Sequence, residues 1–168
     1  DLNKKIVRLK GGREIRYGWL VGADGANSLV RKTLGLPKKT FWCFQWKVKN
    51  PHFEHIEIWL SFMRFGFGAM YLFPHEDFVV VGGGGASPCL SFRDFKDYAY
   101  RFFEKKGLKL SNSNFGLSGI GYDYIQSSFP FRRVSLIGDA GGFADPVTGE
   151  GIAHGMLSAD LEFGNFFD

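Results

Sequence analysis

The sequence predicts a chain of mixed α+β and α/β class, in which an antiparallel sheet with one helix lies between two strand–turn–helix units. Three observations indicate this arrangement. Short apolar runs followed by Gly and Asp stand near both ends of the chain, within residues 21–31 and 136–152. Between them, several segments are rich in the aromatic and β-branched residues that favour strands. Residues 91–106 instead repeat their apolar side chains at helical spacing.

The chain opens on a predicted hairpin, because residues 5–9 and 14–17 flank the turn signal Gly11-Gly12. The first strand–turn–helix unit follows. Residues 19–21 are expected to form its strand, and the turn begins directly after them.

That turn contains Asp24 and Gly25, and Ser28 after it can cap a helix that carries Arg31 and ends at Gly35. A strand that leads through such a turn into a helix presents backbone N–H groups that favour an anion. Taken alone, however, Asp24-Gly25 is equally typical of an ordinary turn.

The middle of the chain predicts an antiparallel sheet covered by one helix. Four strands are expected, at residues 41–49, 54–62, 67–73 and 78–81. Ser91 and Asp94 then form a capping-box-like start, and Gly107 ends the helix. Its Phe-rich stripe is expected to pack against the sheet.

The sequence of residues 79–87 partly matches the pattern of a nucleotide-binding strand followed by a glycine-rich loop. Ser87 stands where the third glycine of G-x-G-x-x-G belongs, and Pro88 argues against a helix that continues from the turn. We therefore interpret the segment as a glycine-rich strand end.

The second strand–turn–helix unit is the more specific one. Residues 134–137 form a short apolar strand, Gly138 permits a tight exit, and Asp139 places a carboxylate at the carboxyl edge of the sheet. A carboxylate there accepts hydrogen bonds from sugar or ribityl hydroxyls. A helix is expected from about residue 150 to 163, and its N-terminus favours negative charge by about 0.3–1 kcal/mol. Its glycine-rich approach and first turn contain Pro146, Gly149, Glu150, Gly151 and Ile152.

The two units, in this order and this far apart, resemble the Gly-Asp-Gly and Gly-Asp motifs of flavoprotein reductases and hydroxylases of the para-hydroxybenzoate hydroxylase type. The second unit looks most like that of the geranylgeranyl reductase family. The resemblance implies FAD as cofactor and NAD(P)H or ferredoxin as electron donor. The FAD contacts that it implies are Asp24, Gly25, Arg31, Gly138, Asp139, Pro146, Gly149, Glu150, Gly151 and Ile152.

The resemblance also implies a division into domains. Residues 1–36 and 129–168 are expected to form part of a Rossmann-like FAD-binding domain, and residues 37–128 an antiparallel-sheet substrate domain. Flavoproteins of this type open with a G-x-G-x-x-G unit for the ADP half of the cofactor. Nothing before Asp24 matches that unit, and the chain begins with Asp1, so we expect a fragment of a longer protein.

A second motif of the family lies in the predicted sheet. Geranylgeranyl reductases have a Tyr-x-Trp-x-Phe-Pro stretch followed, after seven or eight residues, by Gly-x-Gly, and the Tyr and Trp of the first half shape their isoprenoid channel. This chain departs from the first half, with Ala69 in place of Tyr and Tyr71 in place of Trp. The substrate contacts implied by the match are Tyr71, Phe73, Pro74, Gly82 and Gly84.

The predicted function is therefore reduction of carbon–carbon double bonds of an isoprenoid (geranylgeranyl) substrate by hydride transfer from reduced flavin. No side chain is identified as catalytic, since the chemistry belongs to the cofactor. An FAD-dependent monooxygenase or halogenase is the alternative enzyme, because it shares both motifs. A non-catalytic lipid-binding or interaction module is a second alternative.

The composition limits the kinds of partner that the chain is expected to bind. The 168 residues carry a net charge of +4, but Lys and Arg are scattered in ones and twos without a recognition motif, which argues against nucleic acid. Weak attraction to anionic membrane lipid is the alternative to a simple solvated surface. No run of about 18 apolar residues predicts a spanning helix.

Two further residue sets have side chains that can bind metals or react in redox chemistry. Cys43 and Cys89 lack metal-ligand spacing and are expected to be free thiols, as in a reducing cytoplasm. His52, Glu54 and His55 have ligand chemistry, but on the expected strand they point to opposite faces, so no metal site is predicted.

Overall fold

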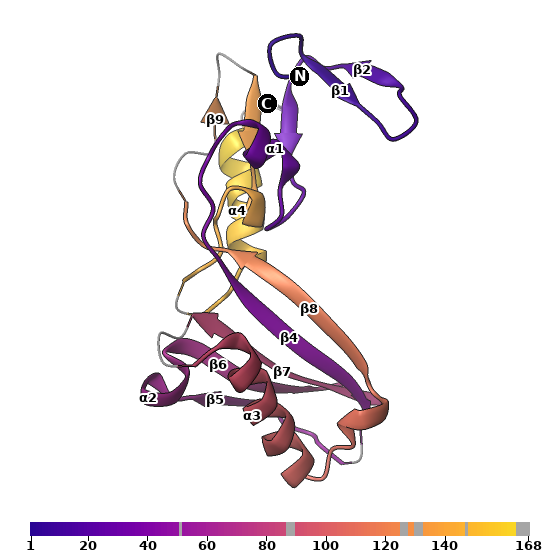
Figure 1. The fold of residues 1–168 in the computed structure, drawn as a ribbon, viewed down its shortest axis with the longest axis vertical. Helices are drawn as coiled ribbons and strands as arrows, with labels where there is room; N and C mark the ends of the chain where they lie inside the picture. Colours follow the sequence, from indigo (N-terminus) through magenta and orange to yellow (C-terminus); the bar gives the residue numbers. More distant parts are fainter. Residues whose placement is uncertain (51, 87–89, 125–127, 130–132, 147, 164–168) are drawn as a thin grey trace. The chain divides into compact units, whose positions relative to one another are not determined.

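The computed structural model describes residues 1–50, 52–86, 90–124, 128–129, 133–146 and 148–163. The chain divides into two compact units, which are shown in Figure 1. Unit 1 comprises residues 1–40, 120–145 and 150–168, and unit 2 comprises residues 41–119 and 146–149.

Unit 1 contains a hairpin and a small mixed sheet. As predicted, β1 (Ile6–Arg8) and β2 (Glu14–Arg16) pair antiparallel. The sheet has the order β3-β10-β9, in which β3 (Leu20–Gly22) runs parallel to β10 (Val134–Leu136), and β9 (Ser128–Phe129) runs antiparallel to β10. All three residues of the central strand β10 are buried.

The helices of unit 1 begin where the two sequence motifs predict. The first is α1 (Leu29–Thr33), which Ser28 caps by accepting a hydrogen bond from the Arg31 N–H at 2.9 Å. A 3-10 turn, η3 (Gly138–Ala140), follows β10, and α4 (Ile152–Phe163) packs beside it.

Unit 2 is built on a five-stranded sheet of order β5-β6-β7-β4-β8. Its strands are β4 (Thr40–Lys49), β5 (Glu57–Leu60), β6 (Phe67–Pro74), β7 (Phe78–Ala86) and β8 (Asn114–Gly121). The pairs β5–β6, β6–β7 and β7–β4 are antiparallel, as expected for the middle of the chain. Two short helices complete the unit, α2 (Phe62–Phe65) and η1 (Leu110–Asn112).

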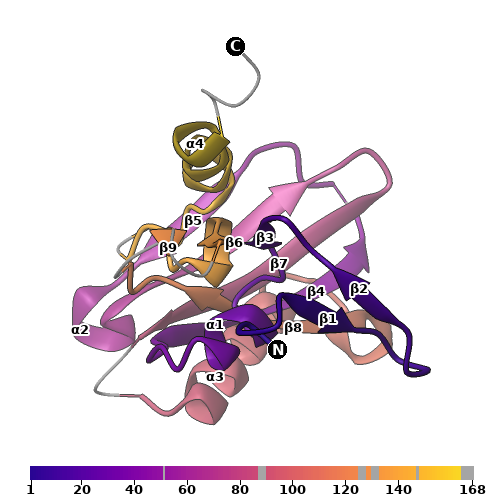
Figure 2. The same cartoon turned by 90° about the horizontal axis from the view of Figure 1, so that it is seen from above.

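The predicted helix is α3 (Phe92–Lys105), and it covers one face of this sheet in both Figure 1 and Figure 2. Ser91 caps it by accepting from the Asp94 N–H at 3.2 Å. The stripe of Phe95, Ala99 and Phe103 is buried against the sheet, which confirms its predicted role. The core of unit 2 therefore lies between α3 and the strands.

Two predicted strand lengths were wrong. The segment expected as a strand at 54–62 is strand only in β5, because the Asn50 side chain bonds both backbone groups of Phe53 and holds a turn there. His52, Glu54 and His55 therefore lie outside any strand. In contrast, β7 runs beyond residue 81 through the glycines to Ala86, so those glycines are strand residues and not a nucleotide loop.

The described ranges contain neither a membrane-spanning helix nor a cluster of metal-ligand side chains. No helix among them is long and apolar enough to cross a membrane. Nor do three or more His, Cys, Asp or Glu side chains in these ranges come close enough together to hold a metal ion. Cys43 is half-buried, and Cys89 lies outside the described residues.

Candidate flavin site

The two Gly-Asp turns leave the same edge of the unit 1 sheet. The parallel register pairs Leu136 with Gly22, and the Ile137 N–H donates to the Gly22 carbonyl at 3.0 Å just beyond the strands. Because β3 and β10 are parallel neighbours, the turns that follow them meet at their carboxyl ends. This edge is where open α/β sheets bind ligands.

Gly138 makes the tight exit that the sequence predicts. Its φ of 54° lies in the left-handed region, and its N–H donates to the Ser158 hydroxyl of α4 at 3.0 Å. A Cβ on Gly155 of α4 would lie only 3.6 Å from the Gly138 Cα. Small residues on this face of α4 thus let the helix pack directly on the turn.

Asp139 places its carboxylate near the start of α4. A Cβ on Gly151 would lie 3.2 Å from the Asp139 Oδ1, so the absence of a side chain there leaves room for the carboxylate. Partial burial raises the pKa of Asp139, and the hydrogen bond to the Gly121 backbone opposes that shift. The carboxylate is thus held by one backbone group at a partly dry position.

The start of α4 is occupied in part by its own residues. Glu150 accepts a hydrogen bond from the Ala153 N–H at 2.7 Å through Oε1, and Oε2 lies 2.5 Å from the His154 Nδ1. One backbone N–H in the first turn of α4 is therefore already bonded to a side chain of the protein and is not free for an anion. Ile152 is exposed.

The remaining residues of the second motif lie in unit 2. Pro146 is exposed, and Gly149 has a φ of 73°, which a residue with a side chain rarely adopts.

Asp24 uses its carboxylate to cap the first helix. Its Oδ2 accepts from the Leu29 N–H at 2.7 Å and lies 3.4 Å from the Val30 N–H. Gly25 permits the preceding turn with a φ of 71°. Asp24 therefore shapes the N-terminus of α1, beside the edge at which the two turns meet.

The buried side chain of Arg31 contacts several separate segments of unit 1. Its Nε donates to the Pro37 carbonyl at 2.8 Å and its Nη1 to the Ala140 carbonyl at 3.3 Å. Its Nη2 forms an ion pair with Asp123 Oδ1 at 3.1 Å, with side chains only 4% and 10% exposed. The guanidinium thereby connects the first motif to the second.

Sequence reasoning missed three residues of this site, namely Gly121, Asp123 and Ser158. A Cβ on Gly121 would lie 2.3 Å from the Asp139 carbonyl oxygen, so only glycine fits there. Nothing in the sequence around Gly121 or Asp123 signals a partner so distant along the chain. The i, i+3 spacing of Gly155 and Ser158 was a usable signal, because small residues on one helix face permit close packing.

The predicted substrate residues lie on the sheet of unit 2. Tyr71 stacks on Phe73 with ring centroids 4.7 Å apart, and Pro74 ends the same strand. Burial, followed by the neighbouring Cys43, raises the pKa of the Tyr71 phenol to about 12. The stack is therefore an apolar, uncharged surface at neutral pH.

The glycines of β7 make room for this surface. A Cβ on Gly82 would lie 2.8 Å from the Tyr71 hydroxyl, and one on Gly84 would lie 2.1 Å from the Cys43 sulfur. Tyr71 and Cys43 thus lie over positions without side chains. They line a cavity of about 170 Å³ together with Gln45.

Comparison with curated proteins identifies archaeal relatives. No family model matches the chain. An uncharacterized protein of Methanosarcina barkeri is 30% identical over 156 residues, which cover 87% of this chain and 38% of that protein. Digeranylgeranylglycerophospholipid reductase 2 of Methanothermobacter thermautotrophicus is 29% identical over 155 residues, with 84% and 38% covered. The chain thus spans 38% of the length of either relative.

Several solved structures share the fold of this chain. A geranylgeranyl bacteriochlorophyll reductase-like protein of Thermoplasma acidophilum has a TM-score of 0.72 at 21% identity, over 91% of this chain and 44% of that one. A flavin-dependent halogenase of Xanthomonas campestris has a TM-score of 0.68 at 15% identity, over 97% and 33%. The chain has the fold of FAD-dependent oxidoreductases. The predicted resemblance to geranylgeranyl reductases is confirmed by the similarity in sequence to the Methanothermobacter protein.

Proposed function

We propose that unit 1 binds the flavin end of FAD in an oxidoreductase that reduces carbon–carbon double bonds of an isoprenoid. The observation that carries the proposal is the parallel pairing of β3 with β10, which brings both Gly-Asp turns to one sheet edge. Asp24 and Asp139 follow these neighbouring strands, as a shared cofactor site requires.

The residues at this edge suit a flavin. Asp139 offers carboxylate oxygens to hydroxyl donors of the ribityl chain, and Gly151 leaves the adjacent space open. The N-terminus of α4 favours negative charge on the ring or the pyrophosphate. When bound, a reduced flavin supplies the hydride, and the protein positions the ring and excludes water.

The substrate class is proposed from the apolar sheet face of unit 2. Ile58 pairs with Tyr71 and Leu60 with Ala69 across β5 and β6, so these side chains share a face. Ile58 and Leu60 are 57% and 67% exposed. A long isoprenoid, carried on a lipid as in the name of the Methanothermobacter relative, suits such a surface. The electron donor would be NAD(P)H or ferredoxin, and lipid-borne substrate would bring the protein to a membrane surface.

Asp139→Ala in the complete protein tests the cofactor site. The change removes a charged acceptor, which contributes about 1.5–3 kcal/mol, so flavin affinity should fall by about one to two orders of magnitude. Flavin content after purification and titration of the apoprotein with FAD measure this. Asp160→Ala, at an exposed position of α4, is the control. Equal flavin content in the two variants would contradict the assignment of Asp139.

The fold shared with the halogenase favours an oxygen-dependent enzyme as the second candidate. Anaerobic mixing separates the two. In a reductase, a geranylgeranyl lipid should reoxidise the reduced flavin without oxygen. In a monooxygenase or halogenase, reoxidation of the reduced flavin should require oxygen. A complete protein that binds no flavin would instead indicate a lipid-binding module.

A further inference from the structure

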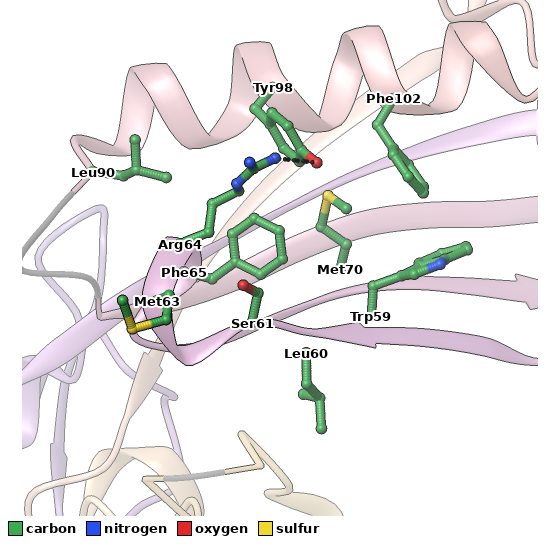
Figure 3. A pocket seen from close by; sticks show the side chains of 10 residues that line it. All are labelled: Trp59, Leu60, Ser61, Met63, Arg64, Phe65, Met70, Leu90, Tyr98 and Phe102. Atoms are coloured by element: carbon green, nitrogen blue, oxygen red, sulfur yellow. Dashed lines mark hydrogen bonds between the residues drawn. The ribbon is translucent and has the colours of Figure 1, made fainter.

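A second apolar cavity lies on the other side of the unit 2 sheet, between α2, α3 and strands β5 and β6 (Figure 3). It has a volume of about 540 Å³, within the size of small-molecule sites. Its walls are Trp59, Phe65, Met70 and Phe102. Figure 3 shows Trp59 and Met70 from the strands and Phe102 from α3 pointing toward one another.

This cavity is distinct from the predicted substrate surface. Neighbouring residues of a strand point to opposite faces, so Met70 faces α3 while Tyr71 faces away from it. Trp59 likewise packs on Phe102 and Phe103 of α3, with ring centroids 4.9 and 5.8 Å away. Leu60, which borders the cavity at its outer side, points away from the other lining residues.

One cation stands at the edge of the cavity. The Arg64 Nη1 donates to the Tyr98 hydroxyl at 2.8 Å, and the Arg64 Cζ lies 4.9 Å from the Tyr98 ring centroid. Within the described ranges, the Arg64 guanidinium has no carboxylate in ion-pair distance. Tyr98 therefore fixes the side chain without neutralising it, and most of the guanidinium donors stay available to an anion.

The cavity also has an apolar rim. Met63, which lines the cavity, is 93% exposed, and Leu60 at its outer side is 67% exposed. Exposed apolar side chains beside an unneutralised cation are the composition of surfaces that bind amphiphiles with a negative head group.

We propose that this cavity binds an amphiphile, with its hydrocarbon chain against the wall of Trp59, Phe65, Met70 and Phe102 and its carboxylate or phosphate on Arg64. The site is separate from flavin binding and does not require it. It gives unit 2 a second contact with lipid, on the α3 face of the sheet.

Quenching of Trp59 fluorescence by a dibrominated stearate tests the proposal on the 168-residue chain. Saturable quenching is expected, and Trp59→Phe should lose it with unchanged circular dichroism. Arg64→Gln should weaken binding by about tenfold, as expected for loss of a charged hydrogen bond. Arg101→Gln, which removes the same charge from an exposed position of α3 outside the cavity, should bind as the unchanged chain does. The uncharged dibrominated stearyl alcohol should not distinguish the two Arg variants.

Vesicles identify the source of the head group. Arg64-dependent sedimentation with phosphatidylglycerol vesicles, but not with phosphatidylcholine vesicles, would place the head group in a bilayer. Binding of the stearate without vesicle binding would indicate a free amphiphile, and both results support the site. Absence of saturable quenching, equal affinities of the two Arg variants, or full quenching in Trp59→Phe would overturn it. None of these readouts involves flavin, so they leave the proposed function untouched.

Discussion

Arg31 shows why the identity of a single residue determines the packing of unit 1. Its planar group reaches a carbonyl in the loop after α1, a carbonyl in the second motif, and a buried carboxylate. A lysine presents its donors from one point and cannot span these three partners at once. The arginine thus fixes segments that are far apart in the chain.

Replacing Arg31 by Ala should destabilise the chain by about 3–5 kcal/mol, because Asp123 would keep a buried charge without its partner. Urea denaturation followed by circular dichroism measures the loss. Arg8→Ala provides the matched control, since its ion pair with Glu14 is exposed and contributes about 0–1 kcal/mol. Similar costs for both changes would show that burial does not determine the strength of the Arg31 contact.

Asp139→Asn should make stability less dependent on pH. Burial raises the folded-state pKa of Asp139 above its unfolded value, so the stability that it contributes is present at low pH and is lost as pH rises through the folded pKa. Asn keeps an acceptor for Gly121 but carries no charge. The melting temperature of the variant should therefore exceed that of the unchanged chain at pH 7, and the difference should shrink at acidic pH. A difference that grows toward acidic pH would contradict this account.

At the scale of elements, the end of β8 depends on a close backbone approach. Gly121→Ala should cost about 1–3 kcal/mol, because its Cβ would meet the Asp139 carbonyl oxygen at 2.3 Å and the backbone must shift. Gly116→Ala in the same strand is the control. Its Cβ would lie 3.4 Å from the flexible Gln45 side chain, so stability should change little. Chemical denaturation of both variants measures these costs. Equal losses of stability in the two variants would contradict the prediction.

Elements with strong local signals could be predicted from the sequence. Ser91, Asp94 and Gly107 specify both ends of α3, and the Gly11-Gly12 turn specifies the first hairpin. The strand β8 was missed because its Asn, Ser and Gly residues have low strand propensity, and pairing in the sheet overrides it. The helix α2 was not predicted, because a single turn with three apolar residues is too short to show a helical period.

The candidate site was predictable to the same degree. The two motifs predicted the turns that contain Asp24 and Asp139, because each motif is a local strand–turn–helix signal. The contacts of Arg31 with Asp123 and of Gly121 with Asp139 were not predictable, because they join residues with no local pattern between them.

At the scale of the whole molecule, the 168-residue chain should not retain FAD. It contains residues for the flavin end but no G-x-G-x-x-G unit for the ADP half, and fewer contacts must still overcome the entropy of association. The purified chain should be colourless or lose colour on dialysis, and added FAD should stay as fluorescent as in buffer. Stoichiometric yellow flavin after gel filtration would contradict this expectation.

The pairing of β3 with β10 also sets an order of folding. Leu20 meets Val134 only after the ribosome has made all of the sheet of unit 2 and its helix α3, so β3 must wait without its partner. Contacts this distant in sequence form slowly, because a long loop has to close first. During synthesis unit 2 can therefore gain its core before unit 1 does, and a chain cut short before residue 134 leaves β3 exposed to proteases and to aggregation.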